Sequence, residues 1–292
     1  MQVAIYGRNF PSSAREDIAT LFSRLHAMQA DVWLFKPFYE FLQTGAGLRP
    51  DIKGTYESHD DLPKQTDFLF SIGGDGTFLE TVGIVRDSGI PVVGINTGRL
   101  GFLSYISLDS LSESLDSIFG DGYDIEERML LKVTSTGGDL NGDQVALNEI
   151  RIYKNTSSLL TVHVHVDGEF LSSYWADGLI LSTPTGSTAY NLSVGGPIVM
   201  PESHNFILSP IAPHNLSVRP LVLPDHASVR FTVDTREPEY QVALDSRSFS
   251  MPAKEQITIS RCSYTLKMVR IENISFYNTL RNKLMWGIDK RN

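Results

Sequence analysis

The segment Gly73-Gly74-Asp75-Gly76-Thr77 combines three glycines with one carboxylate and one hydroxyl group. It follows a mostly apolar run, 67–72, that has the character of a strand, and it precedes apolar positions at helical spacing. Such a loop lies at the carboxyl end of a strand, where open α/β sheets bind their ligands. Adjacent glycines permit a tight turn whose N–H groups bind an anion at the positive end of the helix. The loop therefore predicts a phosphate site.

Asp75 needs a separate explanation, because a carboxylate repels phosphate. Two chemical roles suit it: it binds Mg²⁺, or it accepts the proton of an attacking hydroxyl group. The structural alternative is that Asp75 caps the helix that opens at Thr77, as aspartate commonly does near a helix start. The five residues alone leave these interpretations open.

Three further stretches carry polar groups suited to a nucleotide. Residues 94–103 follow the next predicted strand, 91–95, and are therefore expected beside the glycine loop at the same edge of the sheet. Asn148 and Glu149 place an amide beside a carboxylate, a pair suited to the edges of adenine or ribose. Residues 177–190 gather hydroxyl groups around Pro184 and Gly186.

Strand-like and helix-like segments alternate through the first hundred residues. Strands are predicted at 3–6, 32–35, 67–72 and 91–95. Helical spacing occurs at Ile18, Leu21, Phe22 and Leu25, and again from Leu108 to Ile118. This alternation implies a parallel sheet covered by helices. We therefore expect a Rossmann-like α/β domain that binds nucleotide and phosphate over residues 1–122.

The character of the sequence changes near Glu126, and β-branched residues and turn signals dominate as far as Arg270. Residues 160–166 alternate strictly, and Asp167-Gly168 is a strong hairpin signal. We expect a β-rich domain over residues 123–270, built as a two-sheet sandwich. Residues 271–292 are predicted to hold a C-terminal helix that returns to the first domain.

The composition is that of an ordinary soluble globular protein, with 41% hydrophobic and 20% charged residues. The net charge of -9 argues against a nucleic-acid partner, which would need a basic surface. Cys262 is the only cysteine, so no intrachain disulfide forms. No stretch is apolar enough to span a membrane or to act as a signal peptide. A cytoplasmic protein without a membrane partner is expected.

Together these motifs resemble the NAD kinase family, in the family's order and over nearly the whole chain. The segments 192–197, 213–220 and 280–287 add to the resemblance. It implies transfer of a phosphoryl group from ATP to the adenosine ribose 2′-hydroxyl of NAD, giving NADP, with Mg²⁺ bridging the phosphates of ATP. It also implies a homodimer or homotetramer in which the β domain forms part of the interface and the site.

The resemblance assigns Asp75 as the base that acts on the ribose hydroxyl. The family's nucleotide-binding positions correspond here to Asp75, Gly76, Phe102, Asn148, Glu149, Asp177, Thr185, Thr188, Ala189, Tyr190, Asn191, Leu192 and Ser193. A tyrosine such as Tyr190 is suited to stack on a base while its hydroxyl group finds a polar partner.

Some positions depart from the family pattern. Glu80 and Trp175 stand where many relatives carry a basic residue, and Asp245-Ser246-Arg247 stands where Asp-Gly-Gln is common. We include Arg247 in the predicted site because its charge can compensate, and we leave Glu80 and Trp175 out. His163 and His165 share one strand face but have no third ligand nearby in sequence, so they receive no role.

Two other functions share these features. A lipid kinase of the diacylglycerol or sphingosine type has the same loop and domain plan, although Asn148, Glu149 and residues 183–190 fit a second nucleotide better than an acyl chain. A non-catalytic nucleotide sensor is the other. The sequence leaves open NAD against NADH, ATP against polyphosphate, feedback regulation, dimer against tetramer, and the effect of the departures at Glu80, Trp175 and Arg247.

Overall fold

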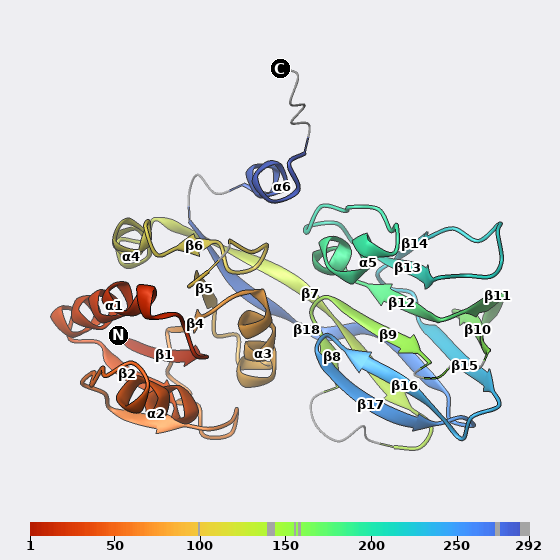
Figure 1. Cartoon of the computed structure of the whole chain (residues 1–292), viewed down its shortest axis with the longest axis horizontal. Helices are drawn as coiled ribbons and strands as arrows, with labels where there is room; N and C mark the ends of the chain where they lie inside the picture. Colours follow the sequence, from red (N-terminus) through yellow and green to blue (C-terminus); the bar gives the residue numbers. More distant parts are fainter. Residues whose placement is uncertain (99, 139–143, 155, 157–158, 272–274, 287–292) are drawn as a thin grey trace. The chain divides into compact units, whose positions relative to one another are not determined.

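The computed structural model describes residues 1–98, 100–138, 144–154, 156, 159–271 and 275–286 (Figure 1). The chain forms two compact units. Unit 1 comprises Met1–Glu127 and Leu266–Asn292, and unit 2 comprises Arg128–Thr265. The fold class predicted from the sequence, a parallel α/β domain and a β-rich domain, is confirmed. None of the helices in the described ranges is long and apolar enough to cross a membrane.

Unit 1 is built on a parallel sheet in the order β5-β4-β1-β2-β3. The strands are β1 (Gln2–Gly7), β2 (Asp31–Phe35), β3 (Gly54–Tyr56), β4 (Phe68–Ile72) and β5 (Val92–Asn96), and β6 (Ile106–Ser107) pairs with β5. Every residue of β4 and β5 is buried, as expected for central parallel strands covered on both faces.

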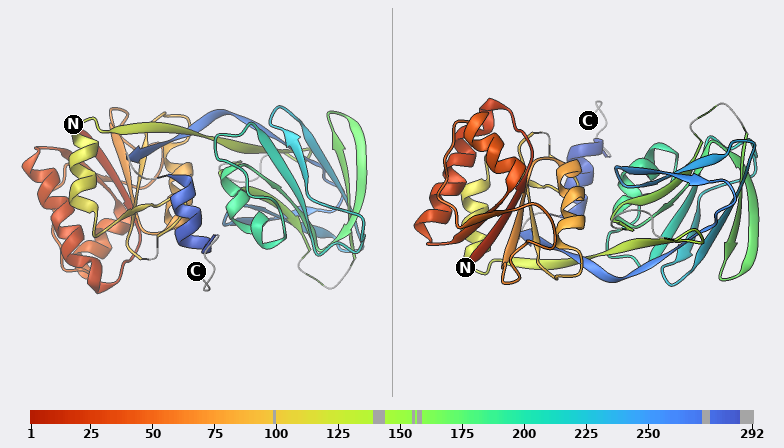
Figure 2. Two further views of the ribbon diagram at one scale, coloured as in Figure 1. Left: turned by 90° about the horizontal axis from the view of Figure 1, so that it is seen from above. Right: turned by 90° about the horizontal axis from the view of Figure 1, so that it is seen from below.

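Unit 1 also contains a set of helices (Figure 2). They are the 3-10 turn η1 (Ser12–Ala14) and the helices α1 (Arg15–Ala27), α2 (Lys36–Thr44), α3 (Asp75–Val85), α4 (Leu111–Phe119) and α6 (Phe276–Leu284). The sequence predicted the helices that correspond to α1, α3, α4 and α6, whereas it predicted neither α2 nor β3. The segment of α2 carries Pro37 and several aromatic residues, which are weak helix signals.

Two strands continue from one unit into the other, β7 (Tyr123–Ser135) and β18 (Ile257–Ile271), and they pair with each other. In unit 2 they join a sheet with β8 (Val145–Ala146), β10 (Leu160–Val166), β11 (Glu169–Ala176) and β15 (Val229–Thr235). The predicted hairpin connects β10 and β11, and both turn residues, Asp167 and Gly168, have positive φ.

The second sheet of unit 2 is antiparallel, in the order β14-β13-β12-β9-β16-β17. Its strands are β9 (Glu149–Tyr153), β12 (Gly178–Ser182), β13 (Asn205–Ile211), β14 (Leu221–Pro224), β16 (Glu239–Leu244) and β17 (Arg247–Pro252). The 3-10 turn η2 (Thr185–Thr188) and the short helix α5 (Tyr190–Ser193) connect β12 to β13. Apolar residues of both sheets form one core, so unit 2 is the predicted sandwich.

Candidate functional site

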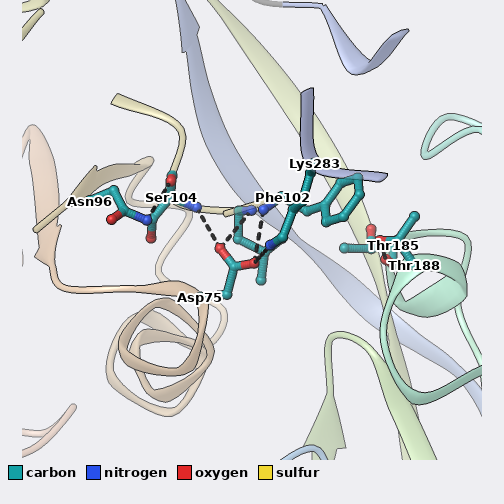
Figure 3. Close-up of polar contacts among 8 residues, drawn as sticks. Asp75, Asn96, Phe102, Ser104, Thr185, Thr188 and Lys283 are labelled. Carbon is teal, nitrogen blue, oxygen red and sulfur yellow. Dashed lines mark hydrogen bonds and ion pairs between the residues drawn. The ribbon is translucent and has the colours of Figure 1, made fainter. Parts of the chain in front are cut away.

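Asp75 is the first residue of α3, at the edge of the sheet where β4 ends. Its carboxylate accepts hydrogen bonds from three consecutive backbone N–H groups: Phe102 to Oδ2 at 2.8 Å, and Leu103 and Ser104 to Oδ1 at 3.0 Å each (Figure 3). Gly74 is the N-cap of α3, and no side chain caps the helix. The capping alternative for Asp75 is therefore wrong, because its carboxylate holds a neighbouring loop instead.

That neighbouring loop follows β5, the parallel neighbour of β4, as the order of segments predicted. Asn96 fixes it from the end of β5: its side-chain amide donates to the Ser104 carbonyl at 3.2 Å, and its Oδ1 accepts from Gly98 N at 2.7 Å. Gly94 lets the loop approach, since a Cβ there would lie 2.7 Å from the Leu103 carbonyl oxygen. A Cβ on Gly101 would lie 1.8 Å from Asp75 Oδ1. Both glycines are needed for space.

Lys283, in the last turn of α6, belongs to the same site of unit 1. Its ammonium lies 3.4 Å from Asp75 Oδ2 and 4.7 Å from the ring centroid of Phe102, whose ring also contacts Phe276 of α6 (Figure 3). Sequence reasoning missed Lys283. It is separated from Asp75 by 208 residues, so no local spacing relates the two.

Glu80, which departs from the family pattern, has a structural partner. Its carboxylate accepts two hydrogen bonds from the Arg8 guanidinium, each 2.8 Å long, and one from the Tyr6 hydroxyl group at 2.9 Å. Burial, followed by the charge of Glu80, raises the pKa of the Tyr6 phenol above its ordinary value. Glu80 thus connects α3 to β1, and the structure explains its acidic character without a ligand.

Unit 2 holds a second cluster, organised by Asp245 in the turn between β16 and β17. Asp245 has a φ of 52° and accepts N–H groups from Leu147, Asn148 and Glu149 at 2.8, 2.8 and 3.1 Å. Burial raises the pKa of its carboxyl group, while these three hydrogen bonds act in the opposite direction. Asp245, which the sequence singled out only as part of a departure, therefore fixes the backbone of the predicted Asn148-Glu149 pair.

The Glu149 side chain is buried beside this clamp. Burial and then the neighbouring Asp245 charge raise the pKa of the Glu149 carboxyl from 4.5 to about 7, whereas Arg151 and the backbone N–H of Tyr190 favour the charged form. Glu149 Oε2 is buried without a hydrogen-bond partner within the described residues. A buried carboxyl group that titrates near neutrality with an unused oxygen is a candidate contact for a polar ligand.

Arg151 and Tyr190 extend the cluster. The Arg151 guanidinium lies 5.2 Å from the ring centroid of Tyr190, and its Nη2 donates to the Asp245 carbonyl at 3.2 Å. The Tyr190 side chain remains 37% exposed, so part of it is available to a ligand. The sequence predicted Tyr190 but missed Arg151, which reads there as one charged residue of an alternating strand.

The hydroxyl-rich turn packs against the 147–149 segment. Thr183 Oγ1 donates to the Leu147 carbonyl at 2.6 Å and accepts from Gly186 N at 3.0 Å. A Cβ on Gly186 would lie 2.0 Å from the Asn148 carbonyl oxygen, so only glycine fits. Thr185 Oγ1 is buried and has no partner within the described residues, so its hydrogen-bonding capacity is unused there.

The side chains of two predicted site residues form hydrogen bonds within the protein. Asn191 is fully buried: its amide nitrogen donates to the Ser187 and Pro197 carbonyls, and its Oδ1 accepts from Ser209 Oγ at 2.6 Å. It shapes the turn through its side chain. Arg247 donates from Nη2 to the Val145 carbonyl, on the backbone that leads to the 147–149 segment.

Asp177 is not brought to this cluster within unit 2. It precedes Gly178 at one end of β12, whereas Ser182 at the other end pairs with Glu149. Five strand residues span roughly 15 Å. Asp177 there forms an ion pair with Lys154 at 2.8 Å. Trp175 of β11, which departs from the family pattern, is half exposed.

The remaining predicted residues lie in or next to α3, η2 and α5. Gly76 is in the first turn of α3, Thr188 ends η2, Ala189 and Leu192 are half-buried, and Ser193 is exposed at the end of α5. Within the described ranges, no group of three or more His, Cys, Asp or Glu side chains is arranged to hold a metal ion.

The chain matches two family models, the ATP-NAD kinase N-terminal domain over residues 39–123 and the ATP-NAD kinase C-terminal domain over residues 147–271. It is 42% identical to the NAD kinase of Flavobacterium psychrophilum and 41% identical to that of Cytophaga hutchinsonii, with 100% of both chains covered in each case. Among solved structures, yeast NADH kinase complexed with NADH has a TM-score of 0.85 at 25% identity, covering 99% of this chain and 88% of that one. An NAD kinase from Archaeoglobus fulgidus in complex with ATP has a TM-score of 0.71 at 25% identity, covering 98% of each chain.

Proposed function

The chain belongs to the NAD kinase family, and we propose that Asp75 is the base in its reaction, the transfer of a phosphoryl group from ATP to the adenosine ribose 2′-hydroxyl of NAD. The observation that carries this proposal is the position of the Asp75 carboxylate at the carboxyl edge of the parallel sheet, held by the loop that follows β5. Formation of NADP from ATP and NAD in a coupled assay tests the reaction. Of the functions considered from the sequence, NAD kinase is the one that the relatives support.

In the proposed mechanism the ribose 2′-oxygen attacks the γ-phosphorus of ATP in line with the departing ADP. Asp75 accepts the hydroxyl proton as the new oxygen–phosphorus bond forms. A general base typically contributes about 10²–10⁴-fold in rate, and phosphoryl transfer depends otherwise on positioning and charge neutralisation. Asp75 is suited to this task because backbone N–H groups, which cannot themselves be titrated, fix both of its oxygens.

We propose that unit 2 contributes the dinucleotide contacts. Glu149 Oε2, Thr185 Oγ1 and Arg151 Nε are buried polar atoms without partners in the described part of the chain, and a ligand rich in hydroxyl and amide groups would satisfy them. Tyr190 offers a ring to a base, and Asn191 acts by shaping the turn. The other proposed contacts in unit 2 are Asn148, Thr188, Ala189, Leu192, Ser193 and Arg247, and those in unit 1 are Gly76 and Phe102. Asp177, which lies at the other end of β12 from this cluster, is proposed to contact a different part of the ligand.

We propose that Mg²⁺ enters as part of the substrate, Mg·ATP. The described residues contain no cluster of three metal-ligating side chains. Mg²⁺ commonly keeps several waters and is held mainly by substrate phosphates.

A pH-dependent stability follows from the buried Glu149. Its pKa is raised in the folded protein to about 7 from 4.5, so its contribution to stability is fully present below about pH 4.5 and is lost as pH rises through about 7. The unfolding free energy of the parent, measured against that of Glu149→Gln, is expected to fall by roughly 1–3 kcal/mol across this window.

Urea denaturation at pH 4.5, 6 and 8 measures this difference. The exposed Glu169 provides the control, because Glu169→Gln should keep the pH dependence of the parent. Equal stability differences for Glu149→Gln at all three pH values would show that the Glu149 carboxyl is not perturbed.

We propose a homo-oligomer in which unit 2 provides part of the interface. β11 is an edge strand of its sheet and exposes Phe170, Leu171 and Trp175, and an exposed apolar edge strand favours pairing with another chain. Light scattering is expected to give at least twice the chain mass of 32.5 kDa. A particle with the mass of a single chain at micromolar concentration would contradict the proposal.

We also propose a cytoplasmic location. The single cysteine is consistent with a reducing compartment, where structural disulfides are rare. Cell fractionation with an antibody to the chain tests the location, and recovery of the protein outside the cytoplasmic fraction would contradict it.

A further inference from the structure

The ammonium of Lys283 occupies a position that the proposed reaction needs. The Asp75 carboxylate offers about four lone-pair positions to hydrogen-bond donors. Leu103 and Ser104 donate to Oδ1, and Phe102 donates to Oδ2. The fourth position, on Oδ2, is the one that Lys283 contacts at 3.4 Å. A ribose hydroxyl that donates its proton to Asp75 must therefore take the place of this ammonium.

The contacts that hold Lys283 on Asp75 are weak enough to be exchanged. The distance of 3.4 Å is long for a charge-assisted hydrogen bond, which is typically about 2.7–2.9 Å. The Lys283 side chain is 38% exposed, and that of Asp75 is 29% exposed, so water screens the pair. The hydrogen bonds from the three backbone N–H groups to Asp75 are shorter, and the backbone fixes their donors. When a ligand arrives, Lys283 is the group that can leave.

A donor phosphate is the natural new partner for this ammonium. The attacking hydroxyl lies on Asp75 Oδ2 and the γ-phosphorus must lie within bonding reach of that hydroxyl, so the oxygens of the transferred group come close to the ammonium as well. Those oxygens carry more negative charge than one carboxylate, and charge neutralisation is the main requirement of phosphoryl transfer. The ring of Phe102, 4.7 Å from Nζ, keeps the ammonium at this edge of the site during the exchange.

We propose that Lys283 is a catalytic residue of this reaction, whose ammonium moves from Asp75 to a non-bridging oxygen of the γ-phosphoryl group when Mg·ATP binds, which opens the position on Asp75 to the ribose hydroxyl. The 2′-oxygen then bonds to phosphorus, the bond from phosphorus to the β–γ bridging oxygen breaks, and ADP leaves with that electron pair. The hydroxyl proton passes to Asp75, and Lys283 remains protonated throughout. This role rests on the proposed function of Asp75.

The test is calorimetric titration of the full-length protein with Mg·ATP in the absence of NAD. Lys283→Met is expected to raise the dissociation constant of Mg·ATP by about tenfold or more, as loss of a hydrogen bond to a charged group predicts. In steady-state assays the same variant is expected to raise the KM of Mg·ATP and to lower kcat, with the KM of NAD unchanged. Lys283→Arg, which retains a cation, is expected to restore most of the binding.

A double variant separates direct contact with phosphate from an effect through Asp75. If Lys283 contacts the phosphate, Lys283→Met weakens Mg·ATP binding also when Asp75 is already Asn. Equal affinities of Asp75→Asn and Asp75→Asn/Lys283→Met would overturn the proposal, and so would parental Mg·ATP affinity in the single Lys283→Met variant. These outcomes are independent of whether Asp75 is the base, which the turnover of Asp75→Asn decides.

Arg281 provides the matched control on the same helix. It is exposed and its guanidinium contacts Asn278 within α6, so Arg281→Met removes a cation from α6 but none from Asp75. It is expected to bind Mg·ATP as the parent does. Lys283 is partly exposed, so Lys283→Met should keep the parental unfolding midpoint. An equal loss of Mg·ATP affinity in Lys283→Met and Arg281→Met would show a general electrostatic effect and would overturn the proposal.

Discussion

Asp75→Asn is expected to lower turnover by about 10²-fold or more, because the amide cannot accept the ribose proton. NAD binding should persist, since the proposed dinucleotide contacts of unit 2 are untouched. Turnover is measured as NADP formation at saturating Mg·ATP and NAD, and binding by calorimetric titration with NAD. A kcat near the parental value would remove Asp75 as the base.

Asp75→Asn is also expected to lower the stability of the protein. An asparagine at position 75 places an NH₂ group opposite either the N–H of Phe102 or those of Leu103 and Ser104, so at least one charge-assisted hydrogen bond is lost. Each such bond contributes about 1.5–3 kcal/mol. A stability loss of this size leaves a typical domain folded, and urea denaturation of the variant verifies that lost turnover does not reflect unfolding.

A second variant displaces the Asp75 carboxylate without changing it. The Cβ of Gly101→Ala would lie 1.8 Å from Asp75 Oδ1, so either the side chain or the loop must shift. Its matched control is Gly98→Ala in the same loop, whose nearest neighbour would be Asn96 Oδ1 at 3.9 Å, an ordinary contact. We expect Gly101→Ala to lose turnover by tenfold or more and Gly98→Ala to retain it.

Removal of divalent cations is expected to abolish nearly all turnover, because the phosphates of ATP carry more charge than Lys283 alone can neutralise. A metal ion that polarises a phosphoryl oxygen supplies several kcal/mol of transition-state stabilisation, which corresponds to a loss of roughly 10²-fold or more on its removal. The assay compares NADP formation in EDTA with formation after excess Mg²⁺ is restored. Full activity in EDTA would show that the reaction proceeds without the metal.

The sequence by itself determined the architecture and the centre of the site. Buried runs such as 67–72, followed by glycines and helical spacing, specify β4, its loop and α3, because burial and backbone freedom are local properties. In the same way Asp167 and Gly168 specified the hairpin between β10 and β11, since a two-residue turn requires positive φ. The motifs also specified the family, which the comparisons confirm. Asp75 was identified with them, although its role as base stays a prediction.

Only the tertiary structure decided what surrounds these residues. Lys283 reaches Asp75 across 208 positions of sequence, Asp245 fixes the backbone of Glu149, and Arg8 accounts for the acidic Glu80. Each contact joins residues from elements that are distant in the sequence and meet only in the fold. No periodicity or local motif in the sequence therefore indicates it. The capping interpretation of Asp75 was wrong for the same reason. The N–H groups that donate to its carboxylate belong to the loop after the next strand, and only folding brings those donors to Asp75.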